Sequence, residues 1–147
     1  MTDNIVLDTN IIISILITPS GKTASLFYAL IKKKKLFTAD FAIEELIKHT
    51  SKIQKLTGYS FLELERLQLS LFSAIHVISR NIIPEEHIIN ALQLCKDVDI
   101  KDSPFIAAAF MVNGNLWTGD KKLTTYLRSK QFTGIYTADD IENLLQL

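Results

Sequence analysis

This sequence has a single cysteine, no apolar run of membrane length and no recognisable export signal. Cys95 is the only cysteine, so the chain can form no internal disulfide, which fits a reducing compartment. The first residues contain no basic segment followed by an apolar stretch, so we expect no signal peptide. The longest apolar runs, such as Ile11–Ile13, are far too short to span a bilayer. We therefore expect a cytoplasmic protein that does not enter a membrane.

The sequence also lacks net charge, because 16 Lys and Arg residues balance 16 Asp and Glu residues. A protein that holds nucleic acid mainly by neutralising phosphates is usually basic, so neutrality argues against a pure DNA-binding module. Neutrality argues less against a nuclease, because an acidic site that recruits divalent cations masks local positive charge in the sum.

Glycine and proline are sparse, with five and three residues, and the chain has no repeat, low-complexity segment or flexible linker. Its composition, 48% hydrophobic and 22% charged, is typical of a globular protein. A length of 147 residues is that of one ordinary domain with its own core, in which we place Cys95 and Trp117. We therefore predict a single domain over residues 1–147.

Short apolar segments typical of buried strands alternate with segments of helical spacing. Strands are predicted at residues 4–7, 36–38, 75–78, 115–118 and 135–136. Helices are predicted at residues 9–17, 23–34, 40–54, 61–71, 84–96, 102–111 and 120–128, and from 137 onwards. Residues 11–13 could instead extend the first strand. The alternation predicts an α/β domain with a mainly parallel central sheet of about five strands and helices on both faces.

In such a sheet, ligands bind beyond the carboxyl ends of the strands, and acidic residues fall at these points of the sequence. They are Asp8, Glu44, Glu45, Asp99, Asp102 and Asp120. Helix capping alone could explain Asp102 and Asp120, each of which begins a predicted helix. Capping explains Asp8 less well, because that residue ends a buried strand, and it does not explain Glu45, which lies inside a helix.

A cluster of carboxylates is costly unless it binds protons or cations. Two unit charges about 4 Å apart repel by roughly 4 kcal/mol at an effective dielectric constant near 20. Mg²⁺ and Mn²⁺ prefer oxygen ligands, and a pair of such ions can activate an attacking water and stabilise the leaving oxygen of a phosphodiester. A set of acids without clustered His or Cys therefore indicates phosphoryl chemistry rather than a zinc site.

Four segments resemble the four motifs of the PIN domain family, in the same order and with matching spacing. They are Ile5–Asn10, Ala42–Leu46, Asp99–Ala109 and Trp117–Leu123, and together they extend over nearly the whole chain. Each motif alone is weak, but all four in order on an α/β pattern are a specific signal. The resemblance implies a PIN-like fold and a Mg²⁺- or Mn²⁺-dependent endoribonuclease that hydrolyses RNA.

The same resemblance implies which residues carry the reaction. The catalytic residues and metal ligands would be Asp8, Glu45, Asp102 and Asp120, with Asn10 and Thr118 orienting the carboxylates. Glu45 is favoured over Glu44 because it directly precedes Leu46, as the acid precedes Leu in the family's second motif. Asp99 is either a fifth acid of the site or a loop residue.

The partners are also implied mainly by resemblance. The turn Thr18–Gly21 resembles a branch of the family described as toxins of toxin–antitoxin pairs, which implies a protein antitoxin that blocks the acidic groove. Phe61–Leu71 has more apolar residues than one helix face needs; core is the first interpretation, and a homodimer or partner surface is the second. The main alternative function is a non-catalytic PIN-like module that binds RNA or a protein.

A second alternative enzyme, a phosphatase with an Asp nucleophile, is disfavoured, because Asn10 stands where the phosphatase pattern has a second Asp.

Basic residues could contact RNA in two places. Lys32–Lys35 is either a solvated helix end or an RNA contact. Four basic residues lie on or just beyond the helix that starts at the fourth motif, where they could contact phosphates: Lys121, Lys122, Arg128 and Lys130.

Overall fold

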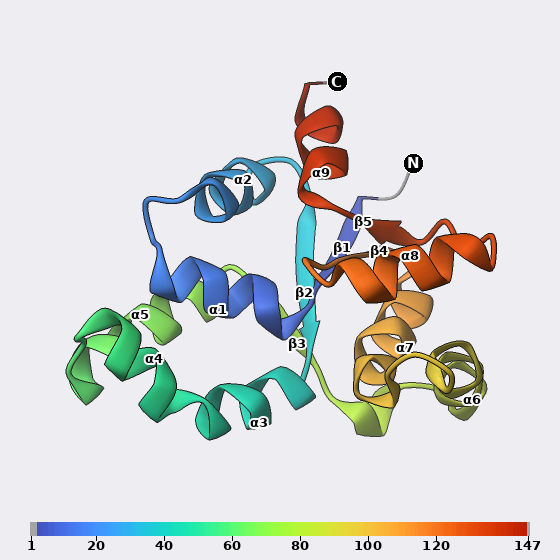
Figure 1. Cartoon of the computed structure of the whole chain (residues 1–147), viewed down its shortest axis with the longest axis horizontal. Coiled ribbons are helices and arrows are strands. Elements are labelled where there is room, and N and C mark those ends of the chain that lie inside the picture. The colour runs from blue at the N-terminus through green and yellow to red at the C-terminus, as the bar shows by residue number, and fades with distance from the viewer. Residues whose placement is uncertain (1–2, 147) are drawn as a thin grey trace.

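The computed structural model describes residues 3–146, and its centre is a parallel sheet with the strand order β3-β2-β1-β4-β5 (Figure 1). The strands are β1 (Asn4–Leu7), β2 (Lys35–Ala39), β3 (His76–Ile78), β4 (Asn115–Trp117) and β5 (Ile135–Tyr136), and every neighbouring pair is parallel. From β1 the chain adds β2 and β3 on one side, then β4 and β5 on the other. The strand order therefore reverses between β1 and β4, and the predicted α/β fold is confirmed.

Helices lie on both sides of the sheet (Figure 1). They are α1 (Thr9–Ile17), α2 (Lys22–Leu30), α3 (Phe41–Lys48), α4 (Thr50–Thr57), α5 (Phe61–Phe72), α6 (Glu85–Cys95), α7 (Ser103–Val112), α8 (Lys121–Ser129) and α9 (Ala138–Leu145), with short 3₁₀ turns at Arg80–Ile82 and Ile100–Asp102. In Figure 1, α1 to α5 lie to one side of the strands, and α6 and α7 lie to the other. Helix α7 packs on β1, β2 and β4, with α6 against it, and α9 packs against α2 and β5.

The core is built around the central strand. Ile5–Leu7 is fully buried, as expected of a parallel strand covered on both faces. On α7 the small side chains of Ala107–Ala109 are buried, and Cys95 and Trp117 lie in the core as predicted. Polar groups in such a core are costly unless they are hydrogen-bonded. The buried polar residues of the described chain are Asp8, Thr9, Thr38, Ser103, Thr118 and Thr124, and most of them follow a strand or begin a helix.

Two predicted helices are wrong in extent. The segment predicted as one helix over 40–54 is two helices, because the backbone of His49 (φ −97°, ψ 7°) interrupts the helix between α3 and α4. The helix predicted over 23–34 ends at Leu30, and a turn leads from there to β2. Asp40 precedes α3, but its carboxylate makes no capping bond to that helix and accepts hydrogen bonds from the backbone N–H and the Nε of Arg80.

Helix α5 buries only part of its apolar surface. Leu64 and Leu71 lie in the core, whereas Phe61, Leu62 and Leu69 are exposed. Core packing, the first interpretation of this segment, therefore accounts for one face of the helix. Within residues 3–146, no single helix is long and apolar enough to cross a membrane; α1 and α2 meet that criterion only jointly, as a pair bent by 114°.

Candidate active site

The candidate site lies where the strand order of the sheet reverses. Asp8 directly follows β1 and Thr118 directly follows β4, and both are buried. The backbone N–H of Asp8 donates to the carbonyl of Trp117 (3.1 Å), so the two strand ends are joined at this point. Crevices at such reversal points are where open parallel sheets bind their ligands.

Asp8 is held at both carboxylate oxygens. Its Oδ2 accepts a hydrogen bond from the Thr118 hydroxyl (2.5 Å), and its Oδ1 accepts one from the backbone N–H of Asn10 (2.9 Å). Burial raises the pKa of Asp8; these two hydrogen bonds lower it, and the negative charges of Glu45 and Asp120 raise it further. Because the Asn10 bond caps α1, the interpretation that capping explains Asp8 poorly is wrong. It is the backbone of Asn10 that contacts the carboxylate, and the residue itself is exposed.

The two neighbouring glutamates of α3, Glu44 and Glu45, contact different residues. Glu45 Oε1 accepts a hydrogen bond from the hydroxyl of Thr9 (2.5 Å), the buried residue that follows Asp8. Glu44 is paired with the guanidinium of Arg80, and its side chain is 57% exposed. The structure therefore brings Glu45, and not Glu44, to the end of β1. Sequence reasoning missed Thr9, because it lies between the polar residues Asp8 and Asn10 and nothing in that pattern distinguishes its hydroxyl.

Asp102 lies at the start of α7 in helical backbone geometry (φ −81°, ψ −14°), and its side chain caps no backbone N–H of the described residues. The interpretation that capping alone explains it is therefore wrong. Its Oδ2 is buried without a hydrogen-bond partner among residues 3–146. Burial raises the pKa of Asp102 from 3.8 to about 7, and the negative charges of four acids contribute. In order of effect these acids are Asp8, Asp99, Asp120 and Glu45.

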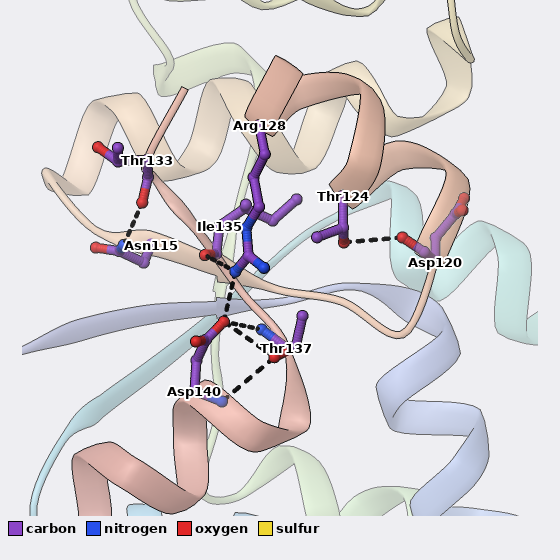
Figure 2. Close-up of polar contacts among 8 residues, drawn as sticks. All are labelled: Asn115, Asp120, Thr124, Arg128, Thr133, Ile135, Thr137 and Asp140. Atoms are coloured by element: carbon purple, nitrogen blue, oxygen red, sulfur yellow. Dashed lines mark hydrogen bonds and ion pairs between the residues drawn. The ribbon is translucent and has the colours of Figure 1, made fainter. Parts of the chain in front are cut away.

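Asp120 both caps a helix and contacts the site. Its Oδ1 accepts the backbone N–H of Leu123 (3.0 Å), so the predicted cap of α8 is confirmed. Its own N–H donates to the Thr118 hydroxyl (3.1 Å), which in turn donates to Asp8. Figure 2 shows Asp120 at the start of α8, with the Thr124 hydroxyl donating to its backbone carbonyl (2.9 Å). Thr118 therefore links two of the predicted acids.

Asp99 shapes the loop before Asp102. Its Oδ1 accepts the backbone N–H of Lys101 (3.0 Å), which caps the 3₁₀ turn Ile100–Asp102. The residue is exposed, yet its charge contributes to the raised pKa of Asp102. Both interpretations of Asp99 thus keep support: it is a loop residue by its hydrogen bond, and it adds negative charge to the site.

The basic residues around α8 have different surroundings. Arg128 Nη2 pairs with Asp140 Oδ2 (2.6 Å), which also accepts from the backbone and hydroxyl of Thr137 at the start of α9 (Figure 2). Lys130 lies over the ring of Tyr126, with its Nζ 5.6 Å from the ring centroid. Lys121 and Arg128 both line a cavity of about 480 Å³ that is also lined by Thr118 and therefore adjoins the candidate site.

The acids offer only oxygen donors, which suits Mg²⁺ or Mn²⁺ rather than zinc. No three His, Cys, Asp or Glu side chains between residues 3 and 146 already form a group that could hold a metal ion. Asp8, Glu45 and Asp120 each direct one oxygen at a protein donor. A carboxylate oxygen has two lone pairs, so these bonds leave room for a cation, and the unpartnered Asp102 Oδ2 fits one as well.

Comparison with known proteins agrees with this arrangement. A family model described as PIN domain matches residues 6–137. A search among curated proteins found no significant match. The matched segment runs from β1 to the residue after β5. It contains every acid whose negative charge raises the pKa of Asp8 or Asp102. With most of its length and all of these acids inside one family match, the chain belongs to the PIN domain family.

Proposed function

We propose that this chain is a Mg²⁺- or Mn²⁺-dependent endoribonuclease. The PIN domain is a nuclease-type fold, which supports phosphodiester hydrolysis as the reaction class. One observation carries the proposal for this chain in particular. Acids from four separate segments interact at the end of the central strand, and one of them, Asp102, has a buried oxygen without a partner among the described residues. A structural cluster of this kind is costly unless a cation joins it.

The residues that would hold the ion or ions are Asp8, Glu45, Asp102 and Asp120. When bound, such a cation supplies the positive charge that makes a water nucleophilic and stabilises the leaving oxygen. The hydroxyls of Thr118 and Thr9 fix the orientation of Asp8 and Glu45, because each donates to one oxygen of its acid. Lys121, beside Thr118, is placed to bind a phosphate of the RNA chain.

The test is cleavage of a mixed RNA pool in Mg²⁺, in Mn²⁺ and in EDTA, with wild type and the Asp8→Asn variant. We expect cleavage that requires the metal and falls by more than about 100-fold in Asp8→Asn, because losing a ligand costs more than losing a residue that orients one. The amide of the variant still offers one acceptor oxygen and the Thr118 hydroxyl can rotate, so the variant should fold. Activity near that of wild type in Asp8→Asn would remove Asp8 from the site.

The neighbouring glutamates supply a matched control. Glu45→Gln should lose both cleavage and stabilisation by Mn²⁺, whereas Glu44→Gln should keep both, because Glu44 pairs with Arg80 instead. The same stabilisation measurement tests the alternative, a PIN-like module that binds RNA or protein without cutting. Thermal unfolding that Mg²⁺ and Mn²⁺ leave unchanged, together with no cleavage, would favour that module.

A toxin role is part of the same proposal. The resemblance of the turn Thr18–Gly21 supports it, and a protein antitoxin would then cover the acids at the strand ends. RNA as substrate and a single, buried cysteine support a cytoplasmic location. Induced expression in a bacterial host should arrest growth with wild type but not with Asp8→Asn. Normal growth with an expressed, RNA-cleaving wild type would instead favour a processing enzyme.

We also propose a homodimer through the exposed face of α5. Phe61, Leu62 and Leu69 form an apolar surface on one helix, and such surfaces commonly mark interfaces. Size-exclusion chromatography with light scattering should give twice the monomer mass for wild type and the monomer mass for Leu69→Lys. A wild-type monomer at high concentration would contradict this assignment.

A further inference from the structure

A second cavity of about 390 Å³ lies beside the end of β2, the strand that neighbours β1 on the side away from β4. It is bounded by the end of β2 at Ala39 and by the start of α7 at Ser103, the residue that follows Asp102. Through Ser103 the cavity therefore adjoins Asp102 of the candidate site. The proposed function uses no residue of its walls.

The walls of the cavity are apolar and include a flat aromatic ring. Phe41, Ile83, Ile88, Pro104 and Ala107 line it. Among them, Ile83 and Ala107 are buried, while Phe41 and Pro104 are half-buried. Unpaired bases of single-stranded RNA are commonly recognised by stacking on such side chains.

The charge around the cavity selects a base rather than a phosphate. Arg80 lines the cavity and is exposed, but its guanidinium pairs with both Asp40 and Glu44. One positive and two negative charges leave this group net negative, which repels a phosphate. A neutral planar ring meets no such penalty, and the lining also offers polar groups for its edge in Asp40 and the exposed Asn81.

The carboxylate also distinguishes among the bases. The two hydrogen bonds that Arg80 donates to Asp40 both fall on Oδ2, from the backbone N–H at 3.1 Å and from Nε at 3.3 Å. Oδ1 retains acceptor capacity, and the Asp40 side chain is 30% exposed. A carboxylate accepts hydrogen bonds from the exocyclic amino group of cytosine or adenine, and uracil has only a carbonyl oxygen there.

We propose that this cavity binds one unpaired base of the RNA, next to the cleaved bond, and that it prefers adenine or cytosine to uracil. The inference rests on the proposed function, because it takes RNA as the ligand. It adds a site that determines where the RNA is cut. Binding of an adenine or cytosine in the cavity would hold the neighbouring phosphodiester bond at Asp102.

The test measures binding rather than cutting. Fluorescein-labelled A₆, C₆ and U₆ oligoribonucleotides are titrated with the full chain carrying Asp8→Asn, and fluorescence anisotropy gives each Kd. A₆ and C₆ should bind at least about fivefold more tightly than U₆, the lower end of the discrimination that one base-edge contact provides. Equal affinity of all three would overturn the inference and leave RNA binding in place. If no oligonucleotide binds, both the inference and RNA as the substrate fail.

Two pairs of variants locate the effect. Ala107→Leu fills the cavity and should bring the Kd values of A₆ and C₆ to that of U₆, while Ala109→Leu, on the same helix but beside a different cavity, should not. Asp40→Ala, at a partly exposed position, should remove the preference even if Ala107→Leu does not fold. Asp97→Ala removes the same charge from an exposed site elsewhere and should keep the preference. An unchanged ratio of affinities in Asp40→Ala would overturn the role of the cavity.

Discussion

Replacing Asp102 with Asn removes a negative charge from a carboxyl group that four other acids repel, and it leaves the shape of the side chain nearly unchanged. In the metal-free protein this repulsion opposes folding, because the unfolded chain separates the acids. With a cation bound, the same carboxylate becomes an attractive partner. The variant should therefore be more stable than wild type without metal and should gain less stability when metal is added.

The size of the effect follows from the surroundings of Asp102. A pair of charges about 4 Å apart repels by about 1 kcal/mol in water and by about 4 kcal/mol at an effective dielectric constant near 20. Asp102 is partly buried, so we expect the variant to gain roughly 1–3 kcal/mol at pH 8 without metal. In a domain of about this size each kcal/mol corresponds to roughly 2–4 °C in Tm.

The effect also has a defined dependence on pH. The pKa of Asp102 is raised from 3.8 to about 7 in the folded protein, so the protonated form is the one that the fold favours. That contribution to stability is fully present below about pH 4 and is lost as the pH rises through about 7. Wild type and Asp102→Asn should therefore differ little at pH 4 and most at pH 8.

Thermal unfolding of both proteins in EDTA at pH 4 and pH 8, and in a series of Mg²⁺ or Mn²⁺ concentrations at pH 8, measures these quantities. A ligand at 100 times its Kd adds about 2.7 kcal/mol to the stability of wild type. Asp102→Asn should lose most of that gain. A variant that is less stable than wild type in EDTA at pH 8, or one that metal stabilises equally, would refute the reasoning.

Three further predictions concern neighbouring residues. Thr118→Val leaves Asp8 Oδ2 without its donor, so the protein should lose about 1–3 kcal/mol in chemical denaturation, and its apparent Kd for Mn²⁺ should rise about tenfold. Equal stability would show that the hydroxyl is dispensable. Lys121→Ala should reduce the slope of log K against log salt for single-stranded RNA by about 0.7, and an unchanged slope would remove Lys121 from the interface. Burial raises the pKa of Cys95 to about 12, so a thiol reagent at pH 8 should label it only in denaturant.

The strands and the acids that follow them could be predicted because both depend on local pattern. Buried parallel strands require continuous apolar runs, and Ile5–Leu7 has no other good interpretation once it is followed by Asp8 and a turn of helix. Since the carboxyl ends of parallel strands share one edge, placing the strands also placed Asp8, Thr118 and Asp120 together. The interruption at His49 has no comparable signal, because no proline or glycine stands there and both flanking segments favour helix.

Long-range contacts could not be predicted from the sequence. Arg80 lies 40 residues after Asp40, and nothing in either segment indicates that they pair. Arg80 pairs with both Asp40 and Glu44, and Arg80 and Asp40 line the second cavity. The choice of Glu45 rested on the neighbouring Leu46 alone, and the structure adds a physical reason in the hydroxyl of Thr9.

Helix capping does not compete with metal binding at this edge of the sheet. Asp8 and Asp120 both cap helices, yet each cap uses one lone pair of a group that has about four, so a cap cannot argue against a ligand. Glu45 and Asp102 distinguish metal binding from helix capping, because neither side chain caps a helix among the described residues. A purely structural site would have no use for a buried, unpartnered oxygen at Asp102, and replacing it would then improve the protein at no cost to function. The metal response of the Asp102→Asn variant therefore tests whether Asp102 is a metal ligand, and the two caps do not.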